Sequence, residues 1–254
     1  MKRLLIILAL LIALPCEARM SVGIVGSGGV AAAADPCGCP TSTYMFCYTG
    51  DHASGTGYAC FTNGTATKNG TVVDATISTD YVSYSAVNDY IEWAVSSDDG
   101  VNDELGTLYF SAYLTDEGDA TLEGGAIIEI FSGTDANNKI LLYSYAANTG
   151  ARGFHVGTAT SHNVIGTGSL TTGAWFRYGL SWNVATSKLS VSIVALGSAH
   201  SWVEEADALV AFDGAAQPTV IRIGESTSGL SVRDIPVLIK NVIILGTYQA
   251  ADPF

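Results

Sequence analysis

The sequence Trp175-Phe-Arg-Tyr-Gly-Leu-Ser-Trp182-Asn183 decides the fold, because large apolar side chains alternate along it with small or polar ones. Successive side chains of a β-strand point to opposite faces of its sheet, so this stretch would present two different faces. One face would fill the core between two sheets with Phe176, Tyr178, Leu180 and Trp182. The other face would lie outside that core and carry Arg177, Gly179 and Ser181.

Strand signals recur on both sides of this stretch, with turn residues between them. We predict strands at residues 71–77, 89–95, 106–114, 125–131, 138–145, 153–157, 175–182, 188–195, 219–223 and 237–245. The best candidate for a single helical turn is Ser201 to Val210, and no segment has a persuasive helical period. Strands without interleaved helices indicate an all-β sandwich or barrel.

The order of turn, strand and hairpin partner around Trp175 resembles that of laminin-G-like domains. In those domains a turn precedes a strand that opens with Trp and closes with Trp-Asp or Trp-Asn, and a partner strand of the form x-Leu-x-Val-x-Val follows. Here Leu170 to Ala174 supplies the turn, Trp182-Asn183 closes the strand, and Ser187 to Val194 is the partner.

Two further segments are similar to strands of that family, Gly106 to Leu114 and Val237 to Ile244, although Lys240 stands where the family often has Asp. The resemblance covers residues 70–248 and implies a two-sheet antiparallel jelly-roll sandwich, the concanavalin A-like fold. Such domains serve as lectins, adhesins, modules attached to enzymes, and glucanases, so the fold alone does not choose the function. A small cysteine-stapled segment, residues 36–69, would precede the sandwich, and a tail, residues 249–254, would follow it.

The start of the chain has the three parts of an export signal. Basic Met1 to Arg3 precedes the apolar run Leu4 to Leu14, which is too short to span a bilayer, and a cleavage site follows Ala18. We therefore predict a signal peptide at residues 1–18 and a secreted protein, extracellular or at the cell surface, with the periplasm as the alternative. No later segment has the length and apolarity of a transmembrane helix.

Residues 19–35 would form a Gly/Ala-rich tether. Within it, Gly26 to Ala31 matches the dinucleotide-binding fingerprint, which needs a helix and a second parallel strand after it. Pro36 and a cluster of cysteines follow instead, so we do not expect a nucleotide site.

Four cysteines follow the signal in one short segment: Cys37, Cys39, Cys47 and Cys60. In an exported chain an even, clustered set indicates two disulfides. Direct pairing of Cys37 with Cys39 is awkward, so we expect each of them to bond to Cys47 or Cys60. A zinc site made of the same four thiolates is the alternative.

The chain is acidic, with a formal net charge of −13 at pH 7. Such a surface repels phosphate backbones, which argues against nucleic acid as a partner, but it is compatible with a divalent cation. Calcium is the cofactor that we expect to fit, because it binds about six to eight oxygen atoms. The two acidic loops run from Asp116 to Asp119 and through the predicted metal ligands Asp98, Asp99, Asp103 and Glu104.

Glycan or cell-surface binding is the function that the outward side chains favour. Sugars need flat aromatic faces for their C–H surfaces and planar polar groups for their hydroxyls. If one concave outer face carried all the residues outside the core, it would bring together Tyr109, Tyr113, Glu129, His155 and Arg177. A loop tryptophan, Trp202, is a further candidate, whereas alternation does not decide which face Trp93 joins.

Two other functions are weighed against binding. The chain could be a structural subunit of an extracellular filament or surface layer, in which case it would self-associate. Glucanases of this fold carry Glu-x-Asp-x-x-Glu on one strand; Glu205-Ala-Asp207 begins that pattern, but Val210 takes its last position. We therefore predict a non-catalytic binding module rather than an enzyme.

Overall fold

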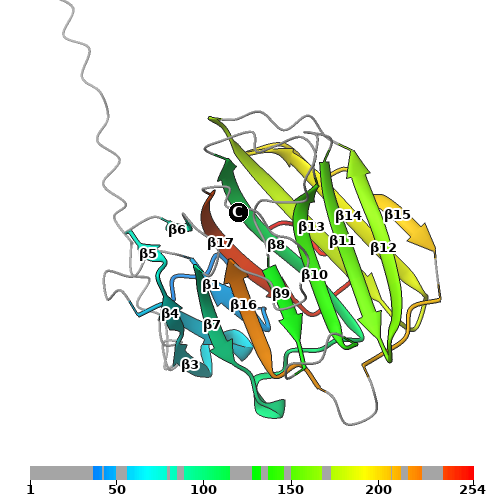
Figure 1. The fold of residues 1–254 in the computed structure, drawn as a ribbon, viewed down its shortest axis with the longest axis horizontal. Helices are drawn as coiled ribbons and strands as arrows, with labels where there is room; N and C mark the ends of the chain where they lie inside the picture. The colour runs from blue at the N-terminus through cyan, green and yellow to red at the C-terminus, as the bar shows by residue number, and fades with distance from the viewer. Residues whose placement is uncertain are drawn as a thin grey trace, which may run out of the picture. The chain divides into compact units, whose positions relative to one another are not determined.

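The alternation seen in residues 175–183 continues in the strands around them, and these strands build two antiparallel sheets (Figure 1). The computed structural model of the protein describes residues 37–41, 43–49, 56–78, 81–84, 89–114, 128–132, 137–145, 150–167, 173–206, 208–212, 217–224 and 237–254. The expected signal peptide, the tether with its Gly26 to Ala31 fingerprint, and the acidic loop Asp116 to Asp119 lie outside the described residues.

One sheet has ten described strands. Eight follow the order β15 (Val203–Ala206), β14 (Lys188–Ala195), β13 (Trp175–Asn183), β8 (Leu105–Leu114), β17 (Val237–Leu245), β1 (Phe46–Tyr48), β2 (Tyr58–Phe61) and β3 (Ala66–Asn69). The other two are β6 (Val82–Tyr84), which pairs with β17, and β5 (Thr76–Ile77), which pairs with β6.

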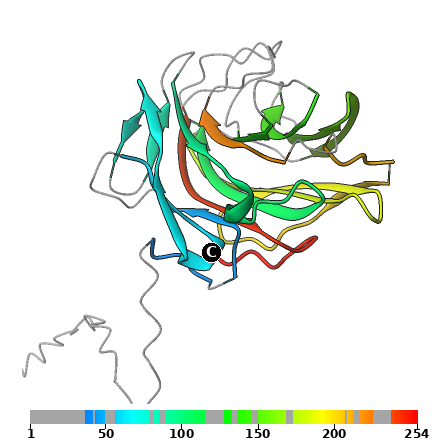
Figure 2. The same ribbon diagram turned by 90° about the horizontal axis from the view of Figure 1, so that it is seen from below.

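The other sheet has seven described strands and faces the first across the core (Figure 2). Their order is β12 (Thr160–Thr167), β11 (Gly150–Gly157), β10 (Lys139–Tyr145), β9 (Ile128–Phe131), β16 (Val220–Gly224), β7 (Tyr90–Ala94) and β4 (Thr71–Val73). Within the described ranges the only helical elements are two 3₁₀ turns, η1 (Thr62–Gly64) and η2 (Ser97–Asp99). The predicted all-β, two-sheet antiparallel sandwich is confirmed.

In β13 the core contains the side chains that alternation assigned to it. Tyr178, Leu180 and Trp182 of β13 are fully buried, and the rings of Tyr178 and Phe110 stack with their centroids 4.8 Å apart. Trp93, whose face alternation left open, is also fully buried, and its indole N–H donates to the carbonyl of Gly57 at 2.6 Å. Trp93 is therefore a core residue.

The prediction of a helical turn at Ser201 to Val210 is wrong. Residues 203–206 form the edge strand β15, which pairs with β14 in a register that sets Leu189 opposite Glu205. Charged residues such as Glu204 and Glu205 are acceptable there because an edge strand has one side open to water.

Strand β12 was missed because its sequence lacks a clear turn before it. Thr158 and Ala159 form that turn with φ angles of 49° and 63°, a region usually taken by Gly or Asn. The hairpin signal that normally marks such a turn is therefore absent from the sequence.

The cysteine-rich segment is part of the sandwich, since β1, β2 and β3 extend the ten-stranded sheet beyond β17. Two disulfides staple it, Cys37–Cys60 and Cys39–Cys47, as expected from the close spacing of Cys37 and Cys39. All four sulfur atoms are thus used in disulfide bonds and not as zinc ligands. Residues 34–254 form one compact unit.

Candidate functional site

The residues predicted to share one binding face lie in three different places. Tyr109 and Tyr113 of β8 and Arg177 of β13 lie on the outer face of the ten-stranded sheet, opposite the core residues of the same strands. Glu129 lies on β9 of the other sheet, and His155 of β11 points between the sheets. The prediction of one shared binding face is therefore wrong for Glu129 and His155, which lie elsewhere.

His155 is fully buried and sits opposite Ile140 in the register of β10 and β11. Its Nε2 lies 3.0 Å from the carbonyl oxygen of Asp103, which satisfies one nitrogen inside the core. Its neighbour Phe154 faces outward beneath the guanidinium of Arg152, with 4.6 Å between Cζ and the ring centroid. This cation–π contact lets Phe154 face outward, so the apolar pattern of the strand is reversed.

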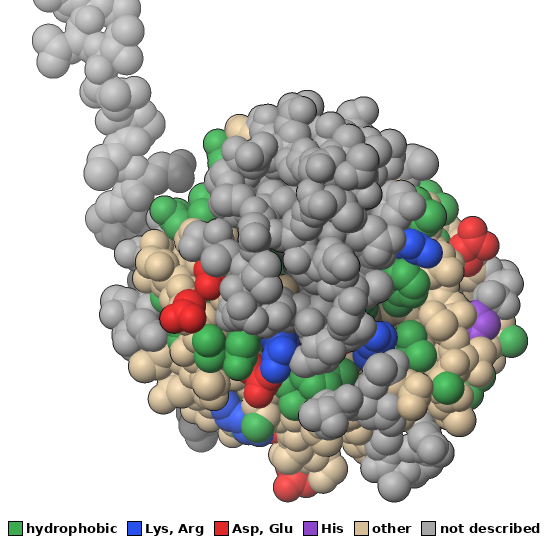
Figure 3. Space-filling model, viewed as in Figure 1, with side chains coloured by type: hydrophobic (Ala, Val, Ile, Leu, Met, Phe, Trp, Pro, Cys, Tyr) green, Lys and Arg blue, Asp and Glu red, His purple; other side chains and the backbone are tan. Residues whose placement is uncertain are grey.

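Glu129 is fully buried on the outer side of the seven-stranded sheet, where it sits opposite Arg222 of β16. Arg222 binds the carboxylate of Glu92 through Nε at 3.0 Å and Nη2 at 2.5 Å. Figure 3 shows this face, where Lys and Arg side chains lie among acidic and apolar ones on the described part. Glu129 is thus separated by the sandwich from Tyr109 and Arg177.

On the outer face of the ten-stranded sheet, the chain after β17 turns back across β8 and β13 (Figure 2, red). We call residues 246–254 the tail segment. Thr107 donates to the carbonyl of Thr247 at 2.5 Å, and Ser181 accepts from the backbone N–H of Gln249 at 2.6 Å. The hydroxyl of Tyr109 donates to the carbonyl of Ala250, so this predicted ligand residue is only 1% exposed.

Arg177 binds Asp252 of the tail segment through two parallel hydrogen bonds, Nε to Oδ2 at 2.7 Å and Nη2 to Oδ1 at 2.8 Å. Its remaining nitrogen, Nη1, donates to Ser111 Oγ and to the carbonyl of Asn241, each at 3.0 Å. Asn241 lies at the irregularity where β17 shifts register against β8, with a φ of 55°. The bulge therefore aims a carbonyl at the guanidinium and fixes its orientation.

His200 joins the same carboxylate, with 3.0 Å between its Nε2 and Oδ2 of Asp252, while its Nδ1 lies 2.9 Å from Ser192 Oγ. Burial raises the pKa of Asp252, but the bonds from His200 and Arg177 outweigh burial and lower it to about 2. Asp252 is therefore a carboxylate at neutral pH.

The row of Ser192, His200 and Asp252 has the residue types of a hydrolase triad, but it presents no nucleophile. Ser192 is 1% exposed, and its Oγ also accepts the backbone N–H of Ser201 at 3.1 Å. A nucleophilic hydroxyl must reach the reacting atom of a substrate. The row instead fastens the loop after β14 to both the sheet and the tail segment.

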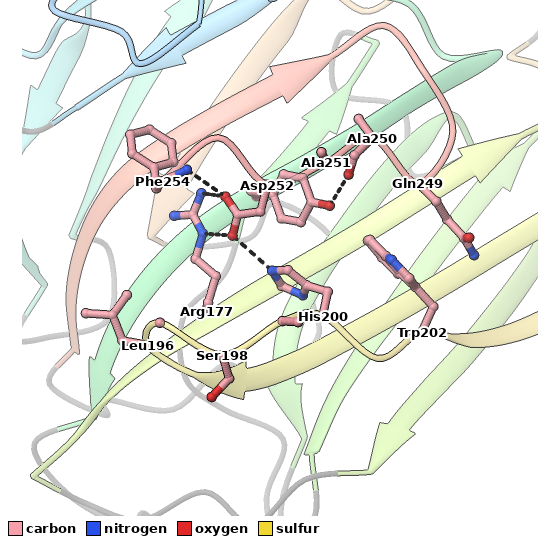
Figure 4. A pocket seen from close by; sticks show the side chains of 13 residues that line it. Arg177, Leu196, Ser198, His200, Trp202, Gln249, Ala250, Ala251, Asp252 and Phe254 are labelled. Carbon is pink, nitrogen blue, oxygen red and sulfur yellow. Dashed lines mark hydrogen bonds and ion pairs between the residues drawn. The ribbon is translucent and has the colours of Figure 1, made fainter.

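A pocket of about 510 Å³ opens between this loop and the tail segment (Figure 4). We call it the tail pocket; residues 196–200 and Trp202 line one side, and residues 249–252 and 254 line the other, with Tyr109 and Arg177 between them. Trp202 packs on His200, with ring centroids 5.5 Å apart. Gly179 makes room for this ring, since a Cβ at Gly179 would lie 2.9 Å from Trp202 Cη2.

A second group of side chains, the aromatic shelf, lies on the same sheet face: Tyr113, Trp175 and Lys240. All three are partly exposed, and the rings of Tyr113 and Trp175 lie 5.6 Å apart. The Lys240 ammonium lies 4.2 Å from the Trp175 ring centroid, so this lysine makes a cation–π contact. Lys240 pairs with Ser111, whose hydroxyl binds Arg177, so the shelf is next to the Arg177 centre.

The four acidic residues predicted to bind calcium point to different partners. Asp98 and Glu104 are exposed. Burial opposes the charge of Asp99, but bonds from Lys68 and Ser96 hold its pKa below the ordinary value.

Asp103, the fourth of these acids, accepts the backbone N–H of Phe212 at 2.8 Å. Among the described residues no three His, Cys, Asp or Glu side chains gather closely enough to hold a metal ion together. Calcium binding by the loop stays a prediction.

Sequence reasoning missed Asp252 and Phe254, because the tail was treated as an appendage, and it missed His200, because the histidines show no ligand spacing. One signal points to Asp252: an arginine in the middle of a strand, Arg177, needs a carboxylate if it is buried. Asp252 is an acid in the tail, one of the segments that the predicted sandwich left without a place.

No family model matches the chain, and no curated protein matches it. Among solved structures it is similar to the receptor binding domain of botulinum neurotoxin mosaic serotype C/D, with 15% identity, 82% of this chain and 48% of that chain covered, and a TM-score of 0.56. The serotype D ligand binding domain in complex with N-acetylneuraminic acid gives 12% identity, 84% and 49% coverage, and a TM-score of 0.52. Trypanosoma rangeli sialidase is 16% identical, with 83% of this chain and 32% of that chain covered, and a TM-score of 0.55.

The chain has the fold of a concanavalin A-like jelly-roll sandwich. It spans about half the length of those neurotoxin domains and about a third of the sialidase chain. At these identities the likeness shows the fold alone. In the part of the chain that the structure describes, no helix is both long and apolar enough to cross a membrane.

Proposed function

We propose that this chain is a non-catalytic carbohydrate-binding module that acts outside the cell, and that the tail pocket receives the glycan. The observation that carries the proposal is the pocket itself: about 510 Å³, open between the rings of Trp202 and Phe254, with polar groups at its base. Ligand sites of this size combine apolar walls with a few fixed polar groups. A sugar ring offers both C–H surface for the aromatic rings and hydroxyls for the polar groups.

The aromatic shelf gives a longer glycan a second contact. Trp175 and Tyr113 provide partly exposed rings on the same sheet face, and Lys240 adds a positive charge beside them. A chain of several sugar units could then extend from the tail pocket across Ser111 to the shelf.

Similar structures and the laminin-G-like motif both support a binding role. The serotype D neurotoxin domain was solved with N-acetylneuraminic acid, a sugar, and other similar structures are named as receptor binding domains. The strand from Trp175 to Asn183, with its turn and hairpin partner, resembles the corresponding strands of laminin-G-like modules.

Export is supported by the signal-like residues 1–18 and by the two disulfides, because disulfides persist in oxidising compartments outside the cytosol. The positions of two acids favour binding over glycan hydrolysis. Glu129 and Glu205 lie on different sheets, whereas retaining glycosidases hold two carboxyl groups about 5 Å apart.

The test is binding of the purified chain to an array of immobilised glycans and cell-wall polysaccharides. We expect at least one glycan class to bind, and Trp202→Ala to weaken that binding by about tenfold, the loss of roughly one stacking contact. Ile165→Ala is the control, since it removes an exposed apolar side chain from β12 of the other sheet. Retention of no glycan, or equal binding by Trp202→Ala, would overturn the proposal.

A further inference from the structure

The later residues of the tail segment are attached differently from the earlier ones. Residues 247–250 are held through backbone atoms by the hydroxyls of Thr107, Tyr109 and Ser181. The side chains of Tyr248 and Gln249 also form hydrogen bonds, to Ser190 and Glu204. In residues 251–254, as far as the described chain shows, every hydrogen bond to the rest of the protein passes through the Asp252 carboxylate. One carboxylate therefore holds this end of the segment in place.

The groups that bind this carboxylate are positioned without help from the tail segment. Ser111 and the carbonyl of Asn241 fix Nη1 of Arg177, which leaves the edge formed by Nε and Nη2 facing Asp252. The pairing of Ser192 with Nδ1 of His200 leaves Nε2 of that ring facing the same carboxylate. A guanidinium held in this way is a ready receptor for a planar carboxylate, whichever molecule carries it.

Arg177 also requires an anion at this place. Its side chain is 2% exposed, and a buried charge without a partner is strongly unfavourable. A second carboxylate could replace Asp252 and restore all of these contacts. A neutral group could not, so the site discriminates in favour of acidic ligands.

The ion pair can be reached from the tail pocket. The side chain of Asp252 is 16% exposed and lines the pocket together with Ala251 and Phe254. Phe254 is 42% exposed, and its ring lies 4.4 Å from Cζ of Arg177. Movement of residues 251–254 would therefore uncover the receptor and enlarge the pocket, while residues 247–250 stayed bound.

We propose that Asp252 is an internal ligand of a carboxylate-binding site, and that a sugar with a carboxylate on its ring displaces residues 251–254 to pair with Arg177 and His200. This inference rests on the proposed function and narrows it to acidic glycans. It also gives the tail segment a role: it competes with the ligand and lowers the affinity of the site.

The test compares the affinity of the full chain for three free sugars, glucuronic acid, N-acetylneuraminic acid and neutral glucose, by calorimetric titration. In Asp252→Asn the internal carboxylate is gone, and we expect at least a tenfold gain for one or both acids, with no gain for glucose. The two acids distinguish uronate from sialate recognition. Glu205→Gln is the matched control, because it removes an exposed carboxylate from β15 and should bind as the unchanged protein does.

Two further measurements connect the gain to the proposed site. Adding Arg177→Gln to Asp252→Asn should abolish the gain, and His200→Gln takes its place if that double variant does not fold. In the unchanged protein the bound acid should shift the backbone NMR signals of Ala251, Asp252 and Phe254 toward random-coil values. The amides of Gln249 and Ala250, which bind Ser181 and Thr107, should stay protected from hydrogen exchange.

The failures of the two proposals are distinguishable. If glycans bind in the tail pocket but Asp252→Asn has no higher affinity for either acid, the proposed displacement of residues 251–254 is overturned and the proposed function stands. If no glycan binds to any variant, both are overturned. A gain in affinity for neutral glucose as large as the gain for the acids would overturn the assigned ligand class.

Discussion

Arg177 on β13 and Asp252 in the tail segment, 75 residues apart in sequence, form two parallel hydrogen bonds of 2.7 and 2.8 Å. The guanidinium is buried, and the carboxylate is the group that brings the end of the chain across the sheet. The pair therefore links the stability of the sandwich to the shape of the tail pocket.

Removal of this carboxylate should destabilise the protein in a pH-dependent way. Asp252→Ala leaves Arg177 without its partner, and we expect the free energy of unfolding at pH 7 to fall by about 2 kcal/mol. Since the folded-state pKa of Asp252 is about 2, below an ordinary unfolded value near 4, its contribution is complete above pH 4 and is lost as the pH falls toward 2. Urea unfolding at pH 7 and pH 2.5 checks this.

The difference in the free energy of unfolding between the unchanged protein and Asp252→Ala should be large at pH 7 and small at pH 2.5. Glu205→Ala serves as the control, because its carboxylate is exposed and should contribute little at either pH. An equal difference at both pH values would show that Asp252 acts through packing and not through its charge.

Buried His155 should make the fold sensitive to mild acid. Burial lowers the pKa of His155, although contact with Asp103 opposes this effect. A histidine with a folded-state pKa below its unfolded value of about 6.5 favours the folded state above that pH, and this stability declines as the pH falls below it. We expect a slope of up to about 1.4 kcal/mol per pH unit below pH 6.5.

His155→Gln should flatten this dependence, because glutamine does not take up a proton and can still donate to the carbonyl of Asp103. Thermal or urea unfolding between pH 7.5 and 5 measures the slope. If the slope of His155→Gln matches that of the unchanged protein, another group is responsible for the acid sensitivity.

The two disulfides should contribute unequally. Cys37–Cys60 spans 23 positions and Cys39–Cys47 spans 8, and a longer loop has more entropy to lose in the unfolded chain. From loop entropy, replacing both cysteines of the first pair by serine should lower the free energy of unfolding by about 3.4 kcal/mol. The same replacement in the second pair should lower it by about 2.5 kcal/mol. Equilibrium unfolding of the two double variants tests the order; a greater loss from the Cys39–Cys47 pair would contradict it.

The fold could be predicted from sequence because the decisive information is local. In residues 175–183 and 106–114 each face of a strand is marked by its own side chains, and a period of two has one structural interpretation. The disulfide pattern was likewise limited by the spacing of Cys37 and Cys39. These features need no knowledge of which strands are neighbours.

The site could not be predicted, because its contacts join distant parts of the chain. Alternation placed Tyr109 and Arg177 on the same face correctly, but it could not say that residues 246–254 would cover that face. It also could not show that Glu129 lies on the other sheet, or that a carbonyl of Asp103 would satisfy His155 in the core. Sheet order and tail placement decide these points, and both are long-range.

The last prediction concerns the space above Gly179, which the Trp202 ring occupies. A Cβ at this position would lie 2.9 Å from Trp202 Cη2 and 3.0 Å from Tyr109 Cε1, so Gly179→Val should push the Trp202 ring away from the sheet. Valine suits a β-strand, and Gly179 lies on the outer face, so the sandwich should still fold.

We therefore expect Gly179→Val to weaken glycan binding about as much as Trp202→Ala does, roughly tenfold, with a loss of stability of about 1 kcal/mol. Gly246→Ala is the matched control, since a Cβ there would meet only Met45 atoms at 3.9 Å, an ordinary contact. Binding titrations and thermal unfolding of both variants are the measurements. Full binding by a folded Gly179→Val would mean that the position of the Trp202 ring does not matter, and that the glycan contacts lie on the aromatic shelf instead.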